Sequence, residues 1–200
     1  MVLLTYPASA QVTRYIDANP VDLQLDIPML GQFRIFFFVH NVQAAATFLG
    51  TVTDHIGSSD ESVLYRASRL ADHSYATLNT PTPESAEYMQ SQRYTAVSRL
   101  YTPALVTTAP KDTVEIAHLP PVLQQSRWAF YLDDIADAAG NQHSATQAWL
   151  GGLEDSEVAV TIVRPDGYVG GISRWDFRAQ AAGQQAAVWL DEYFGGFLEA

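Results

Sequence analysis

The stretch from Val158 to Ile172, VAVTIVRPDGYVGGI, decides the fold, because it carries the clearest local signal in the chain. The β-branched run Val158–Val163 predicts one strand, and Tyr168–Ile172 predicts a second strand that returns beside it. Between them Arg164–Gly167 has the composition of a tight turn, since proline sets φ for the first turn position and Asp-Gly suits the later ones. The stretch therefore predicts an antiparallel β-hairpin.

A buried strand and a helix are predicted near the start of the chain. Phe33–Val39 is apolar at both alternating sets of positions, which is typical of a central strand covered on both faces. Asn41 follows as a helix N-cap, and apolar residues at helical spacing continue to Gly57. The remaining predicted elements are a helix that starts at the Ser58/Glu61 capping-box spacing, β-like stretches at 104–108 and 113–116, a strand at 128–132, a helix at 145–150 and a terminal helix at about 184–198.

This order of elements predicts an α/β protein with a thioredoxin-like fold, because a βα unit leads to a closing hairpin and a last helix. We expect residues 1–30 to form an N-terminal arm and residues 31–200 to form the thioredoxin-like domain. A helical insertion is expected at about 58–100, after the first βα unit. The sequence has no internal repeat.

Composition excludes several classes of function. The 200 residues carry a formal net charge of −11, which disfavours nucleic acid and anionic membranes as partners. There is no cysteine, so disulfides, thiolate nucleophiles, iron–sulfur clusters and cysteine-based zinc sites are excluded. No apolar run is long enough to span a bilayer and no signal peptide is recognisable, so the sequence predicts a soluble cytoplasmic protein.

His40 and Asn41 are the candidate catalytic residues, because they lie at the carboxyl end of the predicted central strand, where open α/β sheets place ligands. His40 would act as a general base and Asn41 would orient a carbonyl group. The alternative is that His40 binds a loop carbonyl and Asn41 only caps the helix.

Tyr65, Arg69 and Tyr131 are the candidate substrate-binding residues, the first two because the helical insertion carries aromatic and arginine side chains. Asp133-Asp134 could hold a metal, but a polar loop or cap is favoured because too few oxygens converge there. The histidines lack zinc spacing, and no metal or other cofactor is expected. His55 is expected to be a solvated surface residue beside Asp54.

Several stretches resemble a known family. The hairpin segment Val160–Gly170 resembles the signature of the C-terminal domain of FAD-dependent phenol hydroxylases (phenol 2-monooxygenases). Weaker similarities follow in the expected order, at 31–35, 114–116, 119–123, 131–134 and 190–198. The resemblance implies a thioredoxin-like dimerisation domain, here as a free-standing chain, whose parent enzymes bind flavin and phenol in other domains.

The sequence also departs from complete enzymes. No GxGxxG follows a first strand, so the chain is not a complete flavin monooxygenase. His40–Gln43 reads HNVQ where thioredoxins carry CxxC, and no proline stands just before Val158, so thiol redox chemistry is not expected.

Two functions remain open at this point. In the first, the domain binds an aromatic or polyketide-like small molecule in secondary metabolism. It would catalyse a cofactor-free acid–base step of biosynthesis, as a cyclase or isomerase or by dehydration. In the second, it is a non-catalytic assembly module that forms a homodimer or docks onto a FAD-dependent aromatic monooxygenase.

Overall fold

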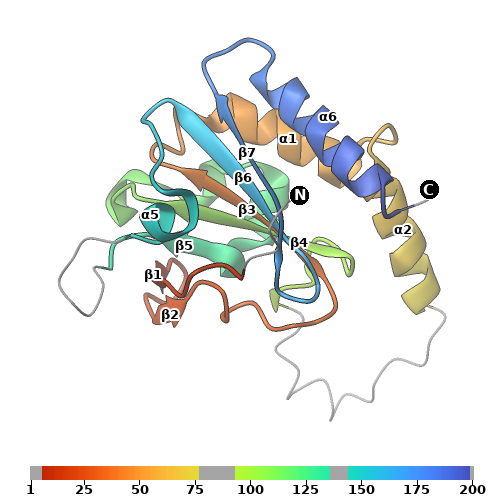
Figure 1. Cartoon of the computed structure of the whole chain (residues 1–200), viewed down its shortest axis with the longest axis horizontal. Helices are drawn as coiled ribbons and strands as arrows, with labels where there is room; N and C mark the ends of the chain where they lie inside the picture. Colours follow the sequence, from red (N-terminus) through yellow and green to blue (C-terminus); the bar gives the residue numbers. More distant parts are fainter. Residues whose placement is uncertain (1–5, 77–92, 136–143, 199–200) are drawn as a thin grey trace.

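The computed structural model describes residues 6–76, 93–135 and 144–198 of the chain (Figure 1). Seven strands of these described residues form one sheet in the order β2-β1-β5-β4-β3-β6-β7. The strands are β1 (Gln11–Arg14), β2 (Pro20–Asp22), β3 (Phe33–Val39), β4 (Tyr101–Thr107), β5 (Phe130–Leu132), β6 (Glu157–Val163) and β7 (Val169–Asp176). The helices are α1 (Ala46–Ser58), α2 (Val63–Ala76), α4 (Pro121–Gln125), α5 (Ala145–Leu150) and α6 (Ala182–Gly195).

The centre of the sheet has the thioredoxin-like arrangement that the sequence predicts. β3 pairs in parallel with β4 and antiparallel with β6, and β6 pairs antiparallel with β7. The predicted hairpin is therefore confirmed as β6 and β7. All seven residues of β3 are buried, as expected for a strand covered on both faces.

The segment predicted as an N-terminal arm contributes to the same sheet. β1 pairs antiparallel with β5, and β2 pairs antiparallel with β1. β5 in turn pairs in parallel with β4. Residues 1–30 thus supply two of the strands beyond the thioredoxin-like core.

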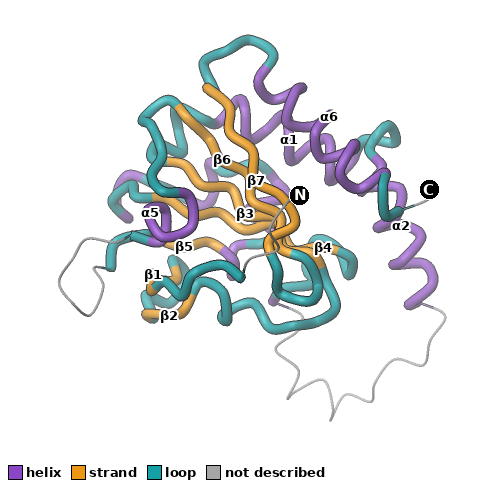
Figure 2. The backbone as a smooth tube through the Cα atoms, in the orientation of Figure 1, coloured by secondary structure: helices purple, strands orange, loops and turns teal. Residues whose placement is uncertain are grey.

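Helices α1 and α6 lie on one side of the sheet and α5 on the other (Figures 1 and 2). An apolar layer packs on each face. Side chains of α1 and α6 pack on one face against alternate residues of β3 such as Ile35 and Phe37. On the other face Phe36 and Phe38 pack with the arm and with Trp149 of α5. The alternation of β3 side chains therefore assigns each helix to one face of the sheet.

Two predicted helix starts and one predicted strand need correction. Residues 42–45 form turns, so α1 begins at Ala46 rather than directly after Asn41. The Ser58/Glu61 capping box is wrong, because α1 continues to Ser58 and Ser62 Oγ accepts the N–H of Tyr65 at the start of α2 instead. The stretch 113–116 is not a strand, since 3₁₀ turns occupy Lys111–Thr113 and Ile116–His118.

Part of the predicted helical insertion, residues 77–92, lies outside the described residues. Its first part is α2, which packs against the helices α1 and α6. Within the described ranges, none of the helices has the length and apolar composition that would let it cross a membrane.

Candidate functional site

His40 lies directly after β3, at the strand end where the sequence places it. Its Nε2 is 2.8 Å from the carbonyl oxygen of Leu153, and its Nδ1 is 2.6 Å from Thr108 Oγ1. A carbonyl oxygen only accepts hydrogen bonds, so Nε2 donates to Leu153, and Nδ1 is bonded to the Thr108 hydroxyl. Both ring nitrogens are therefore hydrogen-bonded within the protein, as expected if His40 binds a loop carbonyl and has no catalytic role.

Asn41 is not the N-cap residue of α1, which is Ala45, but it closes the turn that precedes that helix. Its side-chain Oδ1 accepts the backbone N–H of Ala44 at 3.0 Å and so closes the turn that leads into α1. A side chain held in this way stabilises the first turn. The geometry accounts for Asn41 without a substrate.

Two adjoining cavities, which we call the α1 groove, open beside His40 between α1 and residues 108–120. One has a volume of about 310 Å³ and includes His40 and Thr108 in its wall. The other has a volume of about 190 Å³, is mainly apolar, and includes Leu49 and Leu119. The two share part of their lining, so together they form a continuous groove at the carboxyl end of β3.

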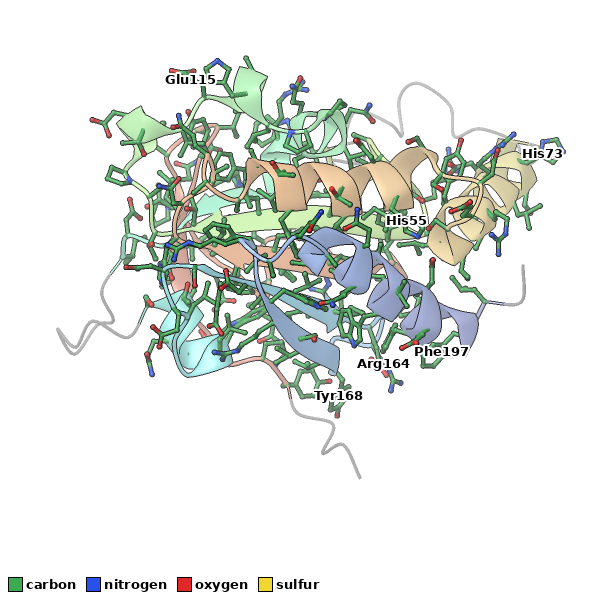
Figure 3. All side chains as sticks on the ribbon, turned by 90° about the horizontal axis from the view of Figure 1, so that it is seen from above. His55, His73, Glu115, Arg164, Tyr168 and Phe197 are labelled. Atoms are coloured by element: carbon green, nitrogen blue, oxygen red, sulfur yellow. The ribbon has the colours of Figure 1, made fainter. Side chains whose placement is uncertain are left out.

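Tyr65 and Arg69 lie together, but they lie far from the α1 groove. Both are on α2, where the Arg69 guanidinium is 5.7 Å from the centre of the Tyr65 ring. α2 follows the carboxyl end of α1, whereas the groove lies at the amino end of α1. The 13 residues of α1 make that helix about 20 Å long, so its length separates the two places. Figure 3 shows Glu115, beside the groove, and His73 of α2 at opposite ends of the molecule.

Tyr131 belongs to a third location, inside the protein. It is fully buried on β5, and its hydroxyl donates to Asp26 Oδ2 at 2.8 Å. Tyr94 donates to the same oxygen at 3.2 Å, and Arg14 forms an ion pair with Asp26. Burial and the Asp26 carboxylate raise the pKa of Tyr131 well above its usual range. Tyr131 therefore holds the core together and does not line the α1 groove.

Of the acidic pair after β5, only Asp133 bonds to the start of a helix, α5. Asp133 is buried and accepts the backbone N–H groups of Ala145 and Thr146 at 2.7 and 2.8 Å. Asp134 instead accepts the Thr13 hydroxyl. Among the residues that the structure describes, no group of three or more acidic or histidine side chains is placed to hold a metal ion.

The expectation for His55 is wrong, because this side chain is not solvated. His55 Nε2 lies 2.7 Å from Asp191 Oδ2, and only 17% of the His55 side chain is exposed. The other oxygen of Asp191 accepts the backbone N–H of Val63 at 2.9 Å. The pairing joins residues 136 positions apart, so no local pattern could have predicted it.

The sequence reasoning also missed a surface at the tip of the β6–β7 hairpin. Side chains from four segments lie around it, some exposed and some half-buried, and we call this surface the tip patch. Its exposed members are Tyr6, Met29 and Phe197, and its half-buried members are Arg164 and Tyr168. The ring centres of Tyr6 and Tyr168 are 4.0 Å apart. Figure 3 shows Arg164, Tyr168 and Phe197 on one side of the molecule.

The architecture defines the class of the protein as thioredoxin-like, here without a cysteine. The family model of the phenol hydroxylase C-terminal dimerisation domain matches residues 7–200, essentially the whole chain. The chain therefore belongs to this family, and the resemblance drawn from the hairpin signature is confirmed.

Solved structures similar to the chain include a Sco-family cytochrome c oxidase assembly protein, at 10% identity and a TM-score of 0.38, covering 96% of this chain and 94% of that one. Peroxidoxin BcpB from Mycobacterium tuberculosis is 13% identical with a TM-score of 0.41, covering 94% and 97%. The mitochondrial 2-Cys peroxiredoxin from Plasmodium falciparum is 11% identical with a TM-score of 0.40, covering 98% and 96%.

Proposed function

We propose that the protein is a non-catalytic assembly module that associates with a second copy of itself through the tip patch. Membership of a family of dimerisation domains supports this function. The observation that carries it is the exposure of large apolar side chains on the patch. Met29 is 62% exposed, Phe197 59% and Tyr6 53%. Large apolar side chains exposed in one region of a surface mark sites of protein association.

Packing against neighbouring side chains holds part of the tip patch in place, which favours a specific contact. The Phe197 ring lies 5.3 Å from that of Tyr193 and 6.5 Å from that of Phe33, which is buried at the start of β3. Gly167 has φ of +87°, so the turn that presents Tyr168 depends on a residue without a side chain. Little ordering would be needed when such a surface is covered, which favours affinity.

Charge gives a way to distinguish a second copy from another kind of partner. Two copies that each carry a net charge of −11 repel one another, and salt screens this repulsion. Self-association through apolar contacts should therefore strengthen with added salt. Binding to a basic surface on a flavin monooxygenase should weaken instead.

Sedimentation equilibrium of the purified chain tests the proposal directly. We expect a dimer whose dissociation constant rises about tenfold or more in Met29→Glu and in Phe197→Glu, because each change places a charge in the apolar contact. Leu25→Glu is the matched control. Leu25 is 70% exposed and lies next to β2, at the other end of the sheet from β7. A monomeric wild-type chain at every concentration, or dimers unaffected by both patch variants, would overturn the proposal.

The α1 groove supports a second candidate function, the binding of an aromatic or polyketide-like molecule and a cofactor-free isomerisation, cyclisation or dehydration. The supporting observation is that the groove opens at His40. Because both ring nitrogens of His40 are already bonded, the imidazole would have to exchange Thr108 for the substrate at Nδ1 before it could take a proton.

Comparison of metabolites from cells with and without the gene separates the two functions. Loss of catalysis should cause a compound to accumulate that has the full oxygen count and differs from the product by a rearrangement or a water molecule. His40→Ala should give the same compound, since loss of a general base lowers turnover about a hundredfold or more. His73→Ala, an exposed histidine on α2, is the control. An accumulated compound that lacks one oxygen atom would instead indicate a failed hydroxylation and an assembly role.

A further inference from the structure

The hydrogen bonds of His40 connect a hydroxyl group, an imidazole and a backbone carbonyl group in one chain. Thr108 Oγ1 lies 2.6 Å from Nδ1 of the ring, and Nε2 donates to the carbonyl oxygen of Leu153, 2.8 Å away. In the neutral ring Nδ1 then carries no proton, so it accepts the proton of the Thr108 hydroxyl. A hydroxyl bonded to a base, with the base oriented by a third group, is the arrangement that activates a nucleophile in covalent catalysis.

The Thr108 hydroxyl belongs to a surface that a ligand reaches. Thr108 is exposed, and it lines the cavity of about 310 Å³ in the α1 groove together with His40. β3 and β4 run in parallel with Val39 opposite Thr107, so the residues that follow them meet at the same edge of the sheet. Thr107 Oγ1 also donates to the carbonyl oxygen of His40 at 3.2 Å, which ties the two strand ends together. The fold itself therefore brings the hydroxyl and the imidazole into one cavity wall.

Asn41 supplies a hydrogen-bond donor in the same wall. Its Oδ1 accepts the N–H of Ala44, which fixes the orientation of the amide and leaves the N–H bonds of Nδ2 to other partners. A carbonyl group attacked by a hydroxyl develops negative charge on its oxygen, and a positioned N–H donor stabilises that charge. The wall thus holds a nucleophile, a base and a donor, the three groups that acyl transfer requires.

The rest of the α1 groove indicates the class of acyl group. The adjoining cavity of about 190 Å³ is mainly apolar, with Leu49, Val114 and Leu119 in its wall. Glu115 also lines it, and the chain has a net charge of −11, so an anionic ligand is disfavoured. Because the two cavities share part of their lining, an apolar group bound in one can present a carbonyl group to the other. A neutral ester of a small apolar acid fits both cavities.

We propose that Thr108 and His40 hydrolyse neutral esters of small apolar acids through an acyl-threonine intermediate. Thr108 Oγ1 attacks the carbonyl carbon and its proton passes to His40 Nδ1. The bond from that carbon to the alcohol oxygen breaks, and the alcohol leaves with the proton. Water then attacks the acyl-threonine and gives a proton to Nδ1, and this proton returns to Oγ1 as the acid is released. Ester and water thus become acid and alcohol, without an oxidant or a reductant.

Hydrolysis of para-nitrophenyl butyrate, which releases a coloured alcohol, tests the activity of the full chain. We expect kcat/KM to fall about a hundredfold or more in Thr108→Val and in His40→Ala. The double variant should fall no further, because groups that act as a unit do not contribute additively. Thr108→Ser should retain activity, since serine keeps the hydroxyl. Thr47→Val is the matched control, because Thr47 is exposed on α1 and does not line the groove.

Diisopropyl fluorophosphate locates the nucleophile, because it forms a stable adduct. An oxygen–phosphorus bond forms at the activated hydroxyl, and fluoride leaves with the proton. Peptide mass mapping should find the adduct on Thr108 in the wild-type chain and not in His40→Ala. The proposal is overturned if Thr108 carries no adduct, if the adduct forms equally without the imidazole, or if Thr108→Val hydrolyses the ester as the wild type does.

The same variants separate this activity from the functions proposed above. If His40 served only as the base of an isomerisation, Thr108→Val would free Nδ1 and would not lower turnover. Thr108 also lies outside the tip patch, so sedimentation of Thr108→Val should match that of the wild type. Failure of the assembly function and failure of the esterase activity therefore appear in different experiments.

Discussion

The contact between Gly170 of β7 and Tyr193 of α6 leaves no room for a side chain at position 170. A Cβ there would collide with Tyr193 Oη, a buried oxygen without a partner among the described residues. Gly170→Ala should therefore lower the free energy of unfolding by about 1–3 kcal/mol, the usual cost of overpacking. Urea unfolding monitored by circular dichroism measures the loss.

Two further variants isolate this contact. Tyr193→Phe removes the buried oxygen, so Gly170→Ala should cost less in that background than in the wild type. Gly195→Ala is the matched control, because an added Cβ meets nothing within 4 Å at the end of α6, and it should be neutral or stabilising by up to about 1 kcal/mol. Equal losses from Gly170→Ala in both backgrounds would rule out the Tyr193 oxygen as the cause.

His40 marks the limit of inference from a single residue's position. The apolar strand before it was enough to place it at the end of β3, and the structure agrees. The two partners that engage its ring, Thr108 and Leu153, are 68 and 113 positions away. Whether an imidazole is free to take a proton depends on such tertiary contacts, and the local sequence does not contain them.

At the scale of elements, Asp191 of α6 connects three helices. Its carboxylate bonds to His55 near the end of α1 and to the N–H of Val63 at the start of α2. Asp191→Ala leaves both partly buried donors without an acceptor, so we expect a loss of about 1–3 kcal/mol in the free energy of unfolding. Amide hydrogen exchange should show the largest acceleration in α2.

Glu192→Ala is the control for Asp191, since Glu192 is the next residue of α6 and is exposed. It should have little effect on stability or on exchange in α2. If both variants lose the same free energy, general changes in α6 rather than the carboxylate contacts account for the effect.

The elements that were predicted correctly are those with a complete local signal. The hairpin has two β-branched runs and a turn of suitable composition, and α5 has a cap and ends at Gly151 with φ of +71°. β2 has only three residues and β1 has four, and both lie in the segment that was expected to be an arm. Strands this short exist because a neighbouring strand pairs with them, so their own sequences carry too little periodicity to predict them.

At the scale of the whole molecule, buried tyrosines should make the protein sensitive to alkali. Burial and the Asp26 carboxylate raise the pKa of Tyr94 to about 12, and burial raises the pKa values of Tyr101 and Tyr131. In the unfolded chain these groups lose their protons near pH 10. Between pH 10 and 12 the unfolded chain therefore binds fewer protons than the folded one, and stability falls as the pH rises.

The measurement is the free energy of unfolding at a series of pH values above 9. In Tyr94→Phe the loss between pH 10 and 12 should be smaller by on the order of 2 kcal/mol, because one titrating group has been removed. The comparison uses the slope with pH, so the hydrogen bond to Asp26 that the variant also loses does not affect the conclusion. A slope identical to that of the wild type would show that Tyr94 does not contribute.

The place of β7 at the end of the sheet has a consequence for how the chain avoids aggregation. A strand without a neighbour on one side offers free N–H and C=O groups to any other extended chain, and such edges can grow into fibres. The exposed side chains toward the end of β7 include Arg174 and Asp176 beside Ile172. Charges of both signs on an outer strand discourage a foreign strand from adding there. If the domain associates with a second copy as proposed, this edge limits the association to the intended surface.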